Sequence, residues 1–397
     1  MPFTSESAPR AASGAAALLL GVLAACTPQT RTAAPPAPVG LENALPGPAA
    51  AANSIGQGPT RIALLVPLSA AGPSGAAARA MRNAAELAYR EGNSTHLQIL
   101  VRDTGGTPEG ATTAANEAVR EGAGLILGPL TAPDVAAAGE VARNSHVNLI
   151  AFSTDPNVAG RGVFLLSFQA DPEINRVVAH AARTGQRAFA AIVPDSPYGA
   201  LAAASFQQAV PANGGRVVAL EKAGNDPSSR QAAAQRIAET VKSGAADALF
   251  LPEAGPGLKA TLDVLAANGV DGRNVKFLGT GVWNDPGTLA DARLQGGWFA
   301  GPDPAKYRDF ANRYRHAYGT DPVRIASLAY DATRLAAELG RQGAHFSSEL
   351  LVNPSGFAGT DGVFRFRREG TAERGLAVLE VQNGTTQPVS PAPDAFP

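Results

Sequence analysis

Short apolar runs alternate with amphipathic stretches along most of this 397-residue chain, starting at residue 61. Seven runs end at Pro, Gly, Asp, Ser or Thr: RIALLVPL, LQILVRD, GLILGPL, VNLIAFS, AFAAIVP, ADALFLP and VKFLGTG. Strands that are covered on both faces of a sheet have this continuous apolar character, without the alternation of half-exposed strands. The pattern therefore predicts buried parallel strands.

The stretches between the runs carry apolar residues at helical spacing. Met81, Ala84, Ala85 and Ala88 fall at i, i+3, i+4 and i+7, and the same spacing recurs within 307–318 and 325–339. Strand and helix in alternation predict an α/β fold of doubly wound, Rossmann-like parallel sheets with right-handed crossovers. A folded body of roughly 320 residues buries more than one core usually holds, so two lobes are expected.

A further apolar run, residues 11–25, is too short to span a bilayer permanently and fits the core of a secretory signal peptide. It ends in Leu-Ala-Ala-Cys, whose Cys26 is the only cysteine of the chain. This tetrad resembles the bacterial lipobox, in which the signal is cut before the cysteine and the sulfur is joined to diacylglycerol. We expect a signal peptide over 1–25 and lipidation of Cys26; the alternative is a chance cysteine in an ordinary signal.

Membrane location follows by analogy from Thr27, because Gram-negative lipoproteins retained at the inner membrane have aspartate at this position. We therefore expect a periplasm-facing lipoprotein anchored to the outer membrane. Residues 26–59, which are rich in Ala, Pro, Gly and Thr, predict a disordered tether that follows the lipidated cysteine. Residues 384–397 predict a disordered tail.

Composition and motifs exclude several classes of function. The formal net charge of −1 offers no field that would attract nucleic acid. The sequence has no G-x-S-x-G, H-E-x-x-H, Walker A or G-x-G-x-x-G motif, and its five histidines are scattered. We expect no catalytic residues, no metal site and no cofactor, and hence a protein that is not an enzyme.

Eight phrases in register resemble the type I periplasmic binding proteins, the family of leucine/isoleucine/valine receptors, over residues 61–383. They are RIALLVPLSA, LILGPLTA, NLIAFSTDP, AFAAIVPDSPYG, ADALFLPEAG, VKFLGTGVWNDP, SLAYDATRLAAE and FAGTDGVFRFRREG. The resemblance implies two α/β lobes joined by three crossings, with ligand in the cleft at the carboxyl ends of the strands. By this analogy the crossings lie near Gln169, Gly301 and Phe346. Lobe 1 is then 60–169 with 302–345, and lobe 2 is 170–301 with 346–383.

The resemblance also implies candidate cleft residues. They are Ser69, Thr131, Ser153 and Thr154 from the first lobe, and Tyr198 from the second. The alternative for Ser153 and Thr154 is a turn that caps a helix, and for Tyr198 it is packing between the lobes.

Receptors of this family carry an acidic residue after the FLG strand, where it pairs with the ammonium group of an amino acid. Gly281 stands at this position here, and Glu253, from the neighbouring strand end, is the candidate replacement. Trp283 is a further candidate, either for ligand contact or as an apolar lid. An amino acid needs both of its charges compensated in a desolvated site, so the sequence predicts weak binding of leucine, isoleucine or valine.

Within this family, the phrases RDTGGTPEGA, AFSTDPNVAG and DGVFRFRREGTAERGLAVLEV look most like lipoproteins known as penicillin-binding protein activators. That resemblance implies a bifunctional penicillin-binding protein as partner and stimulation of peptidoglycan synthesis as function. The alternative is the solute-binding protein of an ABC importer for amino acids or related small molecules. A bound small molecule would favour the importer, and binding of a synthase would favour the activator.

Overall fold

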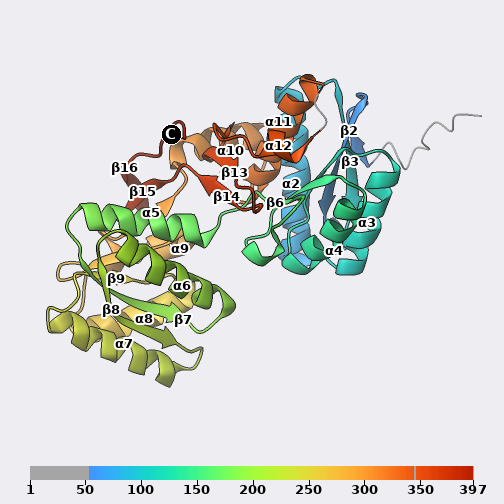
Figure 1. Ribbon diagram of the computed structural model, residues 1–397. Coiled ribbons are helices and arrows are strands. Elements are labelled where there is room, and N and C mark those ends of the chain that lie inside the picture. The colour runs from blue at the N-terminus through green and yellow to red at the C-terminus, as the bar shows by residue number, and fades with distance from the viewer. Residues whose placement is uncertain (1–52, 344–345, 397) are drawn as a thin grey trace, which may run out of the picture. The chain divides into compact units, whose positions relative to one another are not determined.

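The computed structural model describes residues 53–343 and 346–396, which form three sheets and the helices that cover them (Figure 1). The α/β fold of two lobes predicted from the sequence is confirmed. All seven apolar runs contain strands, but the two large sheets are mixed because antiparallel strands complete their edges. The predicted signal peptide, Cys26 and most of the tether lie outside the described residues.

The sheet of lobe 1 has the strand order β1-β3-β2-β4-β5-β6, and only β1 is antiparallel to its neighbour. Its strands are β1 (Ser54–Ile55), β2 (Thr60–Val66), β3 (Leu97–Asp103), β4 (Leu125–Leu127), β5 (Asn148–Ala151) and β6 (Val163–Leu165). Because Ser54–Ile55 pairs with β3 and Ile55 is buried, the predicted tether ends earlier than residue 59. The prediction of disorder is wrong for these last residues.

Helices cover both faces of the first sheet. They are α2 (Gly72–Glu91), α3 (Pro108–Arg120), α4 (Ala132–Asn144), α11 (Ala326–Arg341) and the short α12 (Ser348–Leu351), and α10 (Pro304–Tyr318) packs on the outside of α2 and α11. Met81 of α2 and Leu335 of α11 pack in one apolar cluster with the strands, and Ala114 of α3 and Ala138 of α4 pack in another. The predicted helical stripes therefore face the core.

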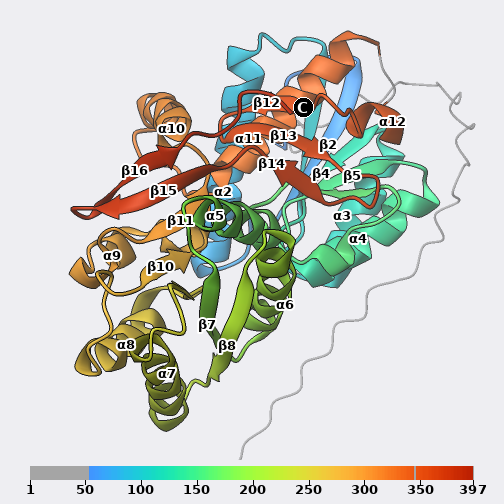
Figure 2. The ribbon, with the colours of Figure 1, turned by 60° about the vertical axis from the view of Figure 1, so that its left-hand side comes forward.

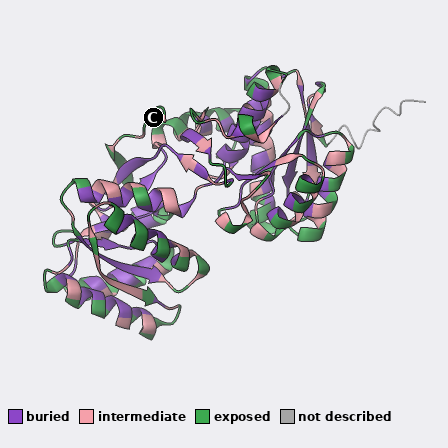
Figure 3. Ribbon diagram, in the orientation of Figure 1, coloured by how far each residue is buried: buried purple, intermediate pink, exposed green. Residues whose placement is uncertain are grey.

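The sheet of lobe 2 has the order β16-β15-β11-β10-β9-β7-β8. Its strands are β7 (Ala188–Pro194), β8 (Arg216–Ala223), β9 (Ala248–Phe250), β10 (Lys276–Gly279), β11 (Trp298–Gly301), β15 (Ala377–Gln382) and β16 (Thr385–Ser390). Its helices are α5 (Ala170–Arg183), α6 (Pro197–Ala212), α7 (Pro227–Lys242), α8 (Gly255–Ala267) and the short α9 (Pro286–Leu289). Phe277 packs toward α7 and α8, whereas the next residue, Leu278, packs toward α5 and α6. Both faces of this sheet are therefore apolar, and Figure 3 shows its central strands largely buried.

The chain passes between the lobes at residues 166–169, at 302–303 and again at 375–376. The expected third crossing near Phe346 is wrong. Phe346 packs in the core of lobe 1, together with Phe364 and Phe366 of a small antiparallel sheet. That sheet consists of β12 (Phe357–Gly359), β13 (Gly362–Phe366) and β14 (Ala372–Arg374). Its apolar side chains keep residues 346–374 on lobe 1, and only β15 and β16 belong to lobe 2.

The end of the chain also differs from the sequence prediction. Residues Thr385–Ser390 form β16, which pairs antiparallel with β15 beside β11 (Figure 2). Most of the side chains of β16 are exposed, so this edge strand lacks the apolar run by which the other strands are recognised. The predicted disordered tail is wrong for these six residues. No helix within 53–343 or 346–396 is both long and apolar enough to cross a bilayer.

Candidate functional site

A cavity of about 190 Å³ lies at the carboxyl ends of β7, β10 and β11 in lobe 2. Open sheets of parallel strands bind ligands at this edge, where the loops leave the strands. The cavity is lined by Phe168, Ala170, Glu173, Tyr198, Gly281, Val282, Asn284, Phe299, Gly301, Pro302 and Arg324. Its walls combine aromatic rings with one carboxylate and one guanidinium group.

Glu173 brings a carboxylate to this cavity from the first turn of α5. The side chain is only 6% exposed, and its Oε2 accepts a hydrogen bond of 2.8 Å from the backbone N–H of Gly281. Burial raises the pKa of Glu173 to about 7, although the Gly281 N–H and the positive charges of Arg324 and Arg374 oppose the shift. The carboxyl group therefore holds a proton far more readily than an ordinary glutamate does.

The absence of a side chain at Gly281 provides the space that the Glu173 carboxylate occupies. A Cβ atom at residue 281 would lie 2.6 Å from Glu173 Oε1, closer than real Cβ contacts allow. Gly281 is the residue that replaces the acidic group expected after the FLG strand. The structure thus places a carboxylate beside this position after all, but α5 supplies it.

Tyr198 lies in the first turn of α6 and lines the same cavity. Its hydroxyl shares a hydrogen bond of 2.8 Å with Oγ1 of Thr280, a residue with no exposed surface. Burial raises the pKa of Tyr198 to about 12, so the phenol stays neutral at physiological pH. Tyr198 offers an aromatic wall and a hydroxyl that already has a protein partner.

Arg324 reaches the cavity from the segment before α11, in lobe 1. Its guanidinium group lies between the rings of Phe168 and Tyr307, 4.4 Å and 4.1 Å from their centroids. Its Nη2 also forms an ion pair of 2.5 Å with Oδ1 of the fully buried Asp361. The positive charge at this wall is therefore largely compensated by protein groups.

Two more buried ionisable groups lie behind this wall. Arg374 is 7% exposed and donates from Nε to the carbonyl of Ser167, whereas no described residue accepts from its two Nη atoms. Asp331 accepts from the N–H of Thr360, but its Oδ2 has no donor among the described residues. Burial, with the negative charge of Asp361, raises the pKa of Asp331 to about 7.

The predicted cleft residues of lobe 1 do not line the 190 Å³ cavity. Ser69 is exposed and uses its backbone N–H to bind Asp103, and Thr131 is an exposed N-cap of α4. Ser153 is buried, and its Oγ accepts from the N–H of Asp155, as in the turn that was the alternative. Thr154 is exposed and borders a separate cavity of about 320 Å³. Of the predicted cleft residues, only Tyr198 lies at this cavity.

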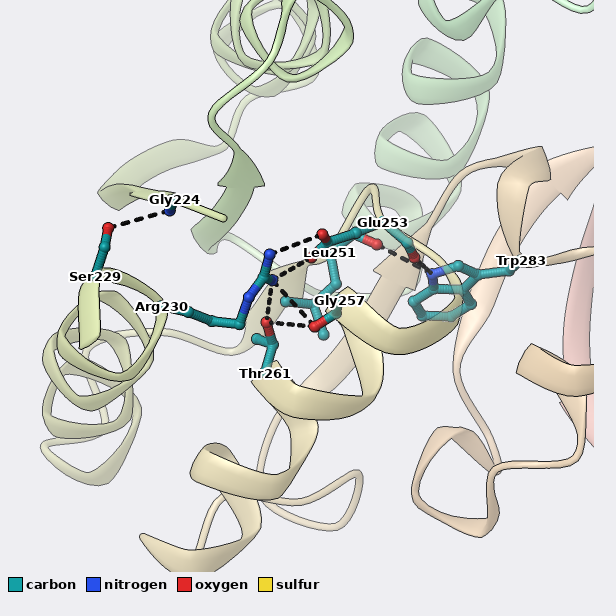
Figure 4. Close-up of polar contacts among 8 residues, drawn as sticks. All are labelled: Gly224, Ser229, Arg230, Leu251, Glu253, Gly257, Thr261 and Trp283. Carbon is teal, nitrogen blue, oxygen red and sulfur yellow. Dashed lines mark hydrogen bonds and ion pairs between the residues drawn. The ribbon is translucent and has the colours of Figure 1, made fainter. Parts of the chain in front are cut away.

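Glu253 and Trp283 have structural partners instead (Figure 4). Arg230 binds both carboxylate oxygens of Glu253, at 2.6 and 3.1 Å, so this carboxylate is not free for an ammonium group. Trp283 has no exposed surface, and its Nε1 donates to the carbonyls of Leu251 and Glu253. In this structure, therefore, neither the predicted replacement acid Glu253 nor the predicted contact or lid Trp283 lines the 190 Å³ cavity, because the first is paired and the second is buried.

Sequence reasoning missed Glu173, Arg324 and Arg374. Glu173 stands in a helical first turn, where an acidic residue is ordinary because it interacts favourably with the helix dipole. The arginines look like two of many surface cations along the chain. No local signal distinguishes these residues, because their burial depends on contacts between distant segments. Among the described residues, no group of three or more His, Cys, Asp or Glu side chains is arranged to hold a metal ion.

The family model of periplasmic binding proteins matches residues 59–386, and the chain therefore belongs to the periplasmic binding protein family. Its members are binding proteins and not enzymes, as the absence of catalytic motifs led us to expect. No curated protein matches the chain.

Solved structures share this fold at low sequence identity. One assigned to a branched-chain amino acid ABC transporter of Rhodospirillum rubrum has a TM-score of 0.75 and 20% identity, over 83% of this chain and 99% of that one. A substrate-binding protein of Desulfitobacterium hafniense in complex with Leu has a TM-score of 0.64 and 17% identity, over 83% and 99%. A solute-binding protein of Rhodopseudomonas palustris in complex with 3,4-dihydroxybenzoic acid has a TM-score of 0.60 and 20% identity, over 84% and 96%.

Proposed function

We propose that this protein is the solute-binding protein of an ABC importer and holds a small organic solute in the 190 Å³ cavity. The observation that carries the proposal is the cavity itself, which places the buried carboxylate of Glu173 at the carboxyl ends of the lobe 2 strands. Solute sites in proteins combine apolar walls with a few placed polar groups, and this cavity has that composition. The ABC transporter proteins of the same fold support the proposal.

Amino acids and aromatic acids are the first solutes to test, because the similar structures contain Leu and 3,4-dihydroxybenzoic acid. The rings of Phe168 and Tyr198 suit an apolar side chain or an aromatic ring. Glu173 and Arg324 supply one group of each charge at the wall. An exchange of solute with a permease would then depend on movement of the lobes.

The test is binding of these solutes by the soluble body, residues 53–397, purified from cells and examined first by native mass spectrometry for a retained molecule. Val282 lines the cavity and is 38% exposed, so Val282→Trp should block the site with little effect on folding. Val389, on β16 and 40% exposed, is a matched position away from the cavity. We expect Val282→Trp to abolish binding measured by calorimetry and Val389→Trp to leave it unchanged; equal binding by both variants would contradict the proposal.

We further propose that Cys26 carries a lipid anchor that holds the protein at a membrane, facing the periplasm. The support is the Leu-Ala-Ala-Cys tetrad behind a short apolar run. The outer-membrane location expected from Thr27 would fit the activator, whereas an importer protein has to meet a permease in the inner membrane. The variant Cys26→Ala should move the protein from the membrane fraction to the soluble periplasmic fraction. Retention of the variant in membranes after a salt wash would argue against the anchor.

Activation of a penicillin-binding protein is the second candidate function, favoured by the sequence phrases that resemble the activators. One argument for the activator was the missing acidic residue at Gly281, and this argument is weaker because Glu173 places a carboxylate beside Gly281. None of the three solved structures reported above is described as an activator. Stimulation of glycan polymerisation by residues 53–397, with no effect of Val282→Trp, would favour the activator over the importer protein.

A further inference from the structure

Buried charges at the cavity do not balance. Three carboxylates, Glu173, Asp331 and Asp361, are 6%, 2% and 0% exposed. Two guanidinium groups, those of Arg324 and Arg374, influence Glu173 electrostatically. With every group ionised, this cluster carries one excess negative charge. A buried excess charge is costly, so the cluster must take up either a proton or a cation.

Glu173 and Asp331 are the two carboxylates of the cluster without an ion pair among the described residues. Arg324 forms its ion pair with Asp361, and Asp331 accepts, within this part of the chain, only from the N–H of Thr360. Glu173 is also the only one of the three carboxylates that lines the cavity.

One oxygen of Glu173 is free to meet a ligand. Oε2 accepts from the N–H of Gly281, and no described residue donates to Oε1. The nearest hydroxyl group on the cavity wall, that of Tyr198, is engaged with Thr280. The aromatic rings of Phe168 and Tyr198 lie on the same wall, and such apolar surroundings strengthen a charge pair formed there.

We propose that Glu173 selects solutes with a protonated amino group, and that this group replaces the proton on Glu173 when the solute binds. This inference rests on the proposed function and names the part of the solute that Glu173 would contact. Gly281 is part of the same recognition site, because a side chain at residue 281 would displace the Glu173 carboxylate from the Gly281 N–H that it accepts from. Charge recognition thus comes from α5 and not from the strand end.

The first experiment compares solutes that differ only in the amino group. The probes are the twenty protein amino acids, the matched carboxylic acids without the amino group and the matched primary amines, each tested by calorimetry on residues 53–397. We expect amino-bearing probes to bind, and Glu173→Gln to weaken them by about thirtyfold or more, because a buried charge loses its partner. Glu239→Gln, at an exposed carboxylate of α7, is the control and should change nothing.

The second experiment moves the carboxylate. Glu173→Ala should lose binding, and Glu173→Ala combined with Gly281→Glu should recover a large part of it. The new side chain starts from a Cβ directed at the space that Glu173 Oε1 vacates, 2.6 Å away in the native protein. Gly281→Glu alone should bind worse than the native protein, since two carboxylates would then compete for one space. Merely structural roles for Glu173 and Gly281 would give no recovery.

The third experiment counts protons. Binding measured in buffers of different ionisation enthalpy should release close to one proton per solute at pH 6 and almost none at pH 8, and affinity should rise by about tenfold over this range. In Glu173→Gln both effects should disappear.

Each pattern of results decides the inference. Binding that is insensitive to Glu173→Gln, or that is confined to carboxylic acids without an amino group, would overturn it and leave the proposed function standing. A native protein that binds no probe would overturn the proposed function for these solutes and the inference with it.

Discussion

Glu253 and Glu173 are two carboxylates of lobe 2 with opposite surroundings. Arg230 holds both oxygens of Glu253 and also donates to the carbonyl of Gly257 and to Thr261 Oγ1, each at 3.0 Å (Figure 4). Glu173 is more deeply buried but has one backbone donor and no ion pair among the described residues. A buried charge whose partners are complete indicates architecture, whereas one with a free oxygen at a cavity indicates ligand contact.

The Arg230–Glu253 pair connects elements that must stay together. Arg230 lies in α7, and Glu253 follows β9 just before α8. The backbone at Glu253 is held from its other side by the Nε1 of Trp283, which follows β10. This network therefore fixes one end of the sheet, on which the walls of the cavity are built.

The largest effect we predict comes from breaking the complete pair. Arg230→Ala should lower the free energy of unfolding by about 3 kcal/mol, because it leaves Glu253 partly buried without a partner. Urea denaturation measures this change. Arg236→Ala is the matched control, since Arg236 is 55% exposed in its pair with Glu221, and it should cause a much smaller change. An equal loss in both variants would mean that burial does not distinguish the two pairs.

Removing the carboxylate of Glu173, which has no ion pair among the described residues, should raise the free energy of unfolding and not lower it. Burial raises the pKa of Glu173 to about 7 from its ordinary value of 4.5, so the folded state keeps a proton that the unfolded chain has already released. Native stability should therefore fall as the pH rises from about 4.5 to 7 and then level off. Glu173→Gln removes this unfavourable contribution and should be more stable than the native protein by about 3 kcal/mol at pH 8.

Urea denaturation of both proteins from pH 4.5 to pH 8 is the measurement. Some slope should persist in Glu173→Gln, because burial and Asp361 also raise the pKa of Asp331 to about 7. Equal slopes in the native protein and in the variant would show that Glu173 ionises normally.

The contrast between Glu253 and Glu173 also shows which features of the structure could be predicted from the sequence and which could not. The central strands were predictable, because burial on both faces imposes an apolar run such as that of β10. β8 and β16 were missed because they lie at the edges of the sheet and keep polar, partly exposed residues. An apolar run therefore identifies many core strands but not all of them, since β11 and β15 lie inside the same sheet and were not among the seven predicted runs.

The site was less predictable than the fold. Tyr198 was found because it belongs to a local motif, the YG after a strand. Glu253 was proposed because it follows a strand end, Glu173 was not considered, and only the structure reveals that Arg230 already binds Glu253. The partner of Glu253, Arg230, lies 23 residues away along the chain, and the donor to Glu173, Gly281, lies 108 residues away. Spacing along the chain cannot decide such a difference.

A smaller loss of unfolding free energy should follow from a change in Trp283, which holds the backbone at Glu253 opposite Arg230. Trp283→Phe keeps an aromatic ring but removes the donor to the carbonyls of Leu251 and Glu253, and should cost about 1 to 2 kcal/mol of unfolding free energy. Trp298→Phe is the control, since Trp298 is only half-buried and donates to the side chain of Glu380. Urea denaturation should give a clearly smaller loss for the control, and the reverse order would contradict the assigned role of Trp283.

The smallest effect should come from Tyr198, which lies at the same cavity as Glu173 but has a satisfied hydroxyl. Tyr198→Phe removes one hydrogen bond and leaves Thr280 Oγ1 buried without it, so stability should fall by about 1 kcal/mol. Affinity for an amino-bearing solute should change by less than about fivefold, because Thr280 and not the solute holds the hydroxyl. Since burial raises the pKa of Tyr198 to about 12, its loss should leave the pH dependence of binding unchanged.

The double variant Tyr198→Phe with Thr280→Val tests this explanation. It removes both partners, so it should regain most of the stability that Tyr198→Phe loses, as measured by urea denaturation. Calorimetry from pH 6 to pH 8 should still find the native pH dependence. The contrary result would be that Tyr198→Phe weakens solute binding as strongly as Glu173→Gln. The Tyr198 hydroxyl would then have to bind the solute and not Thr280. In that case, a hydrogen bond to a protein group would not show that a residue at the cavity makes no ligand contact.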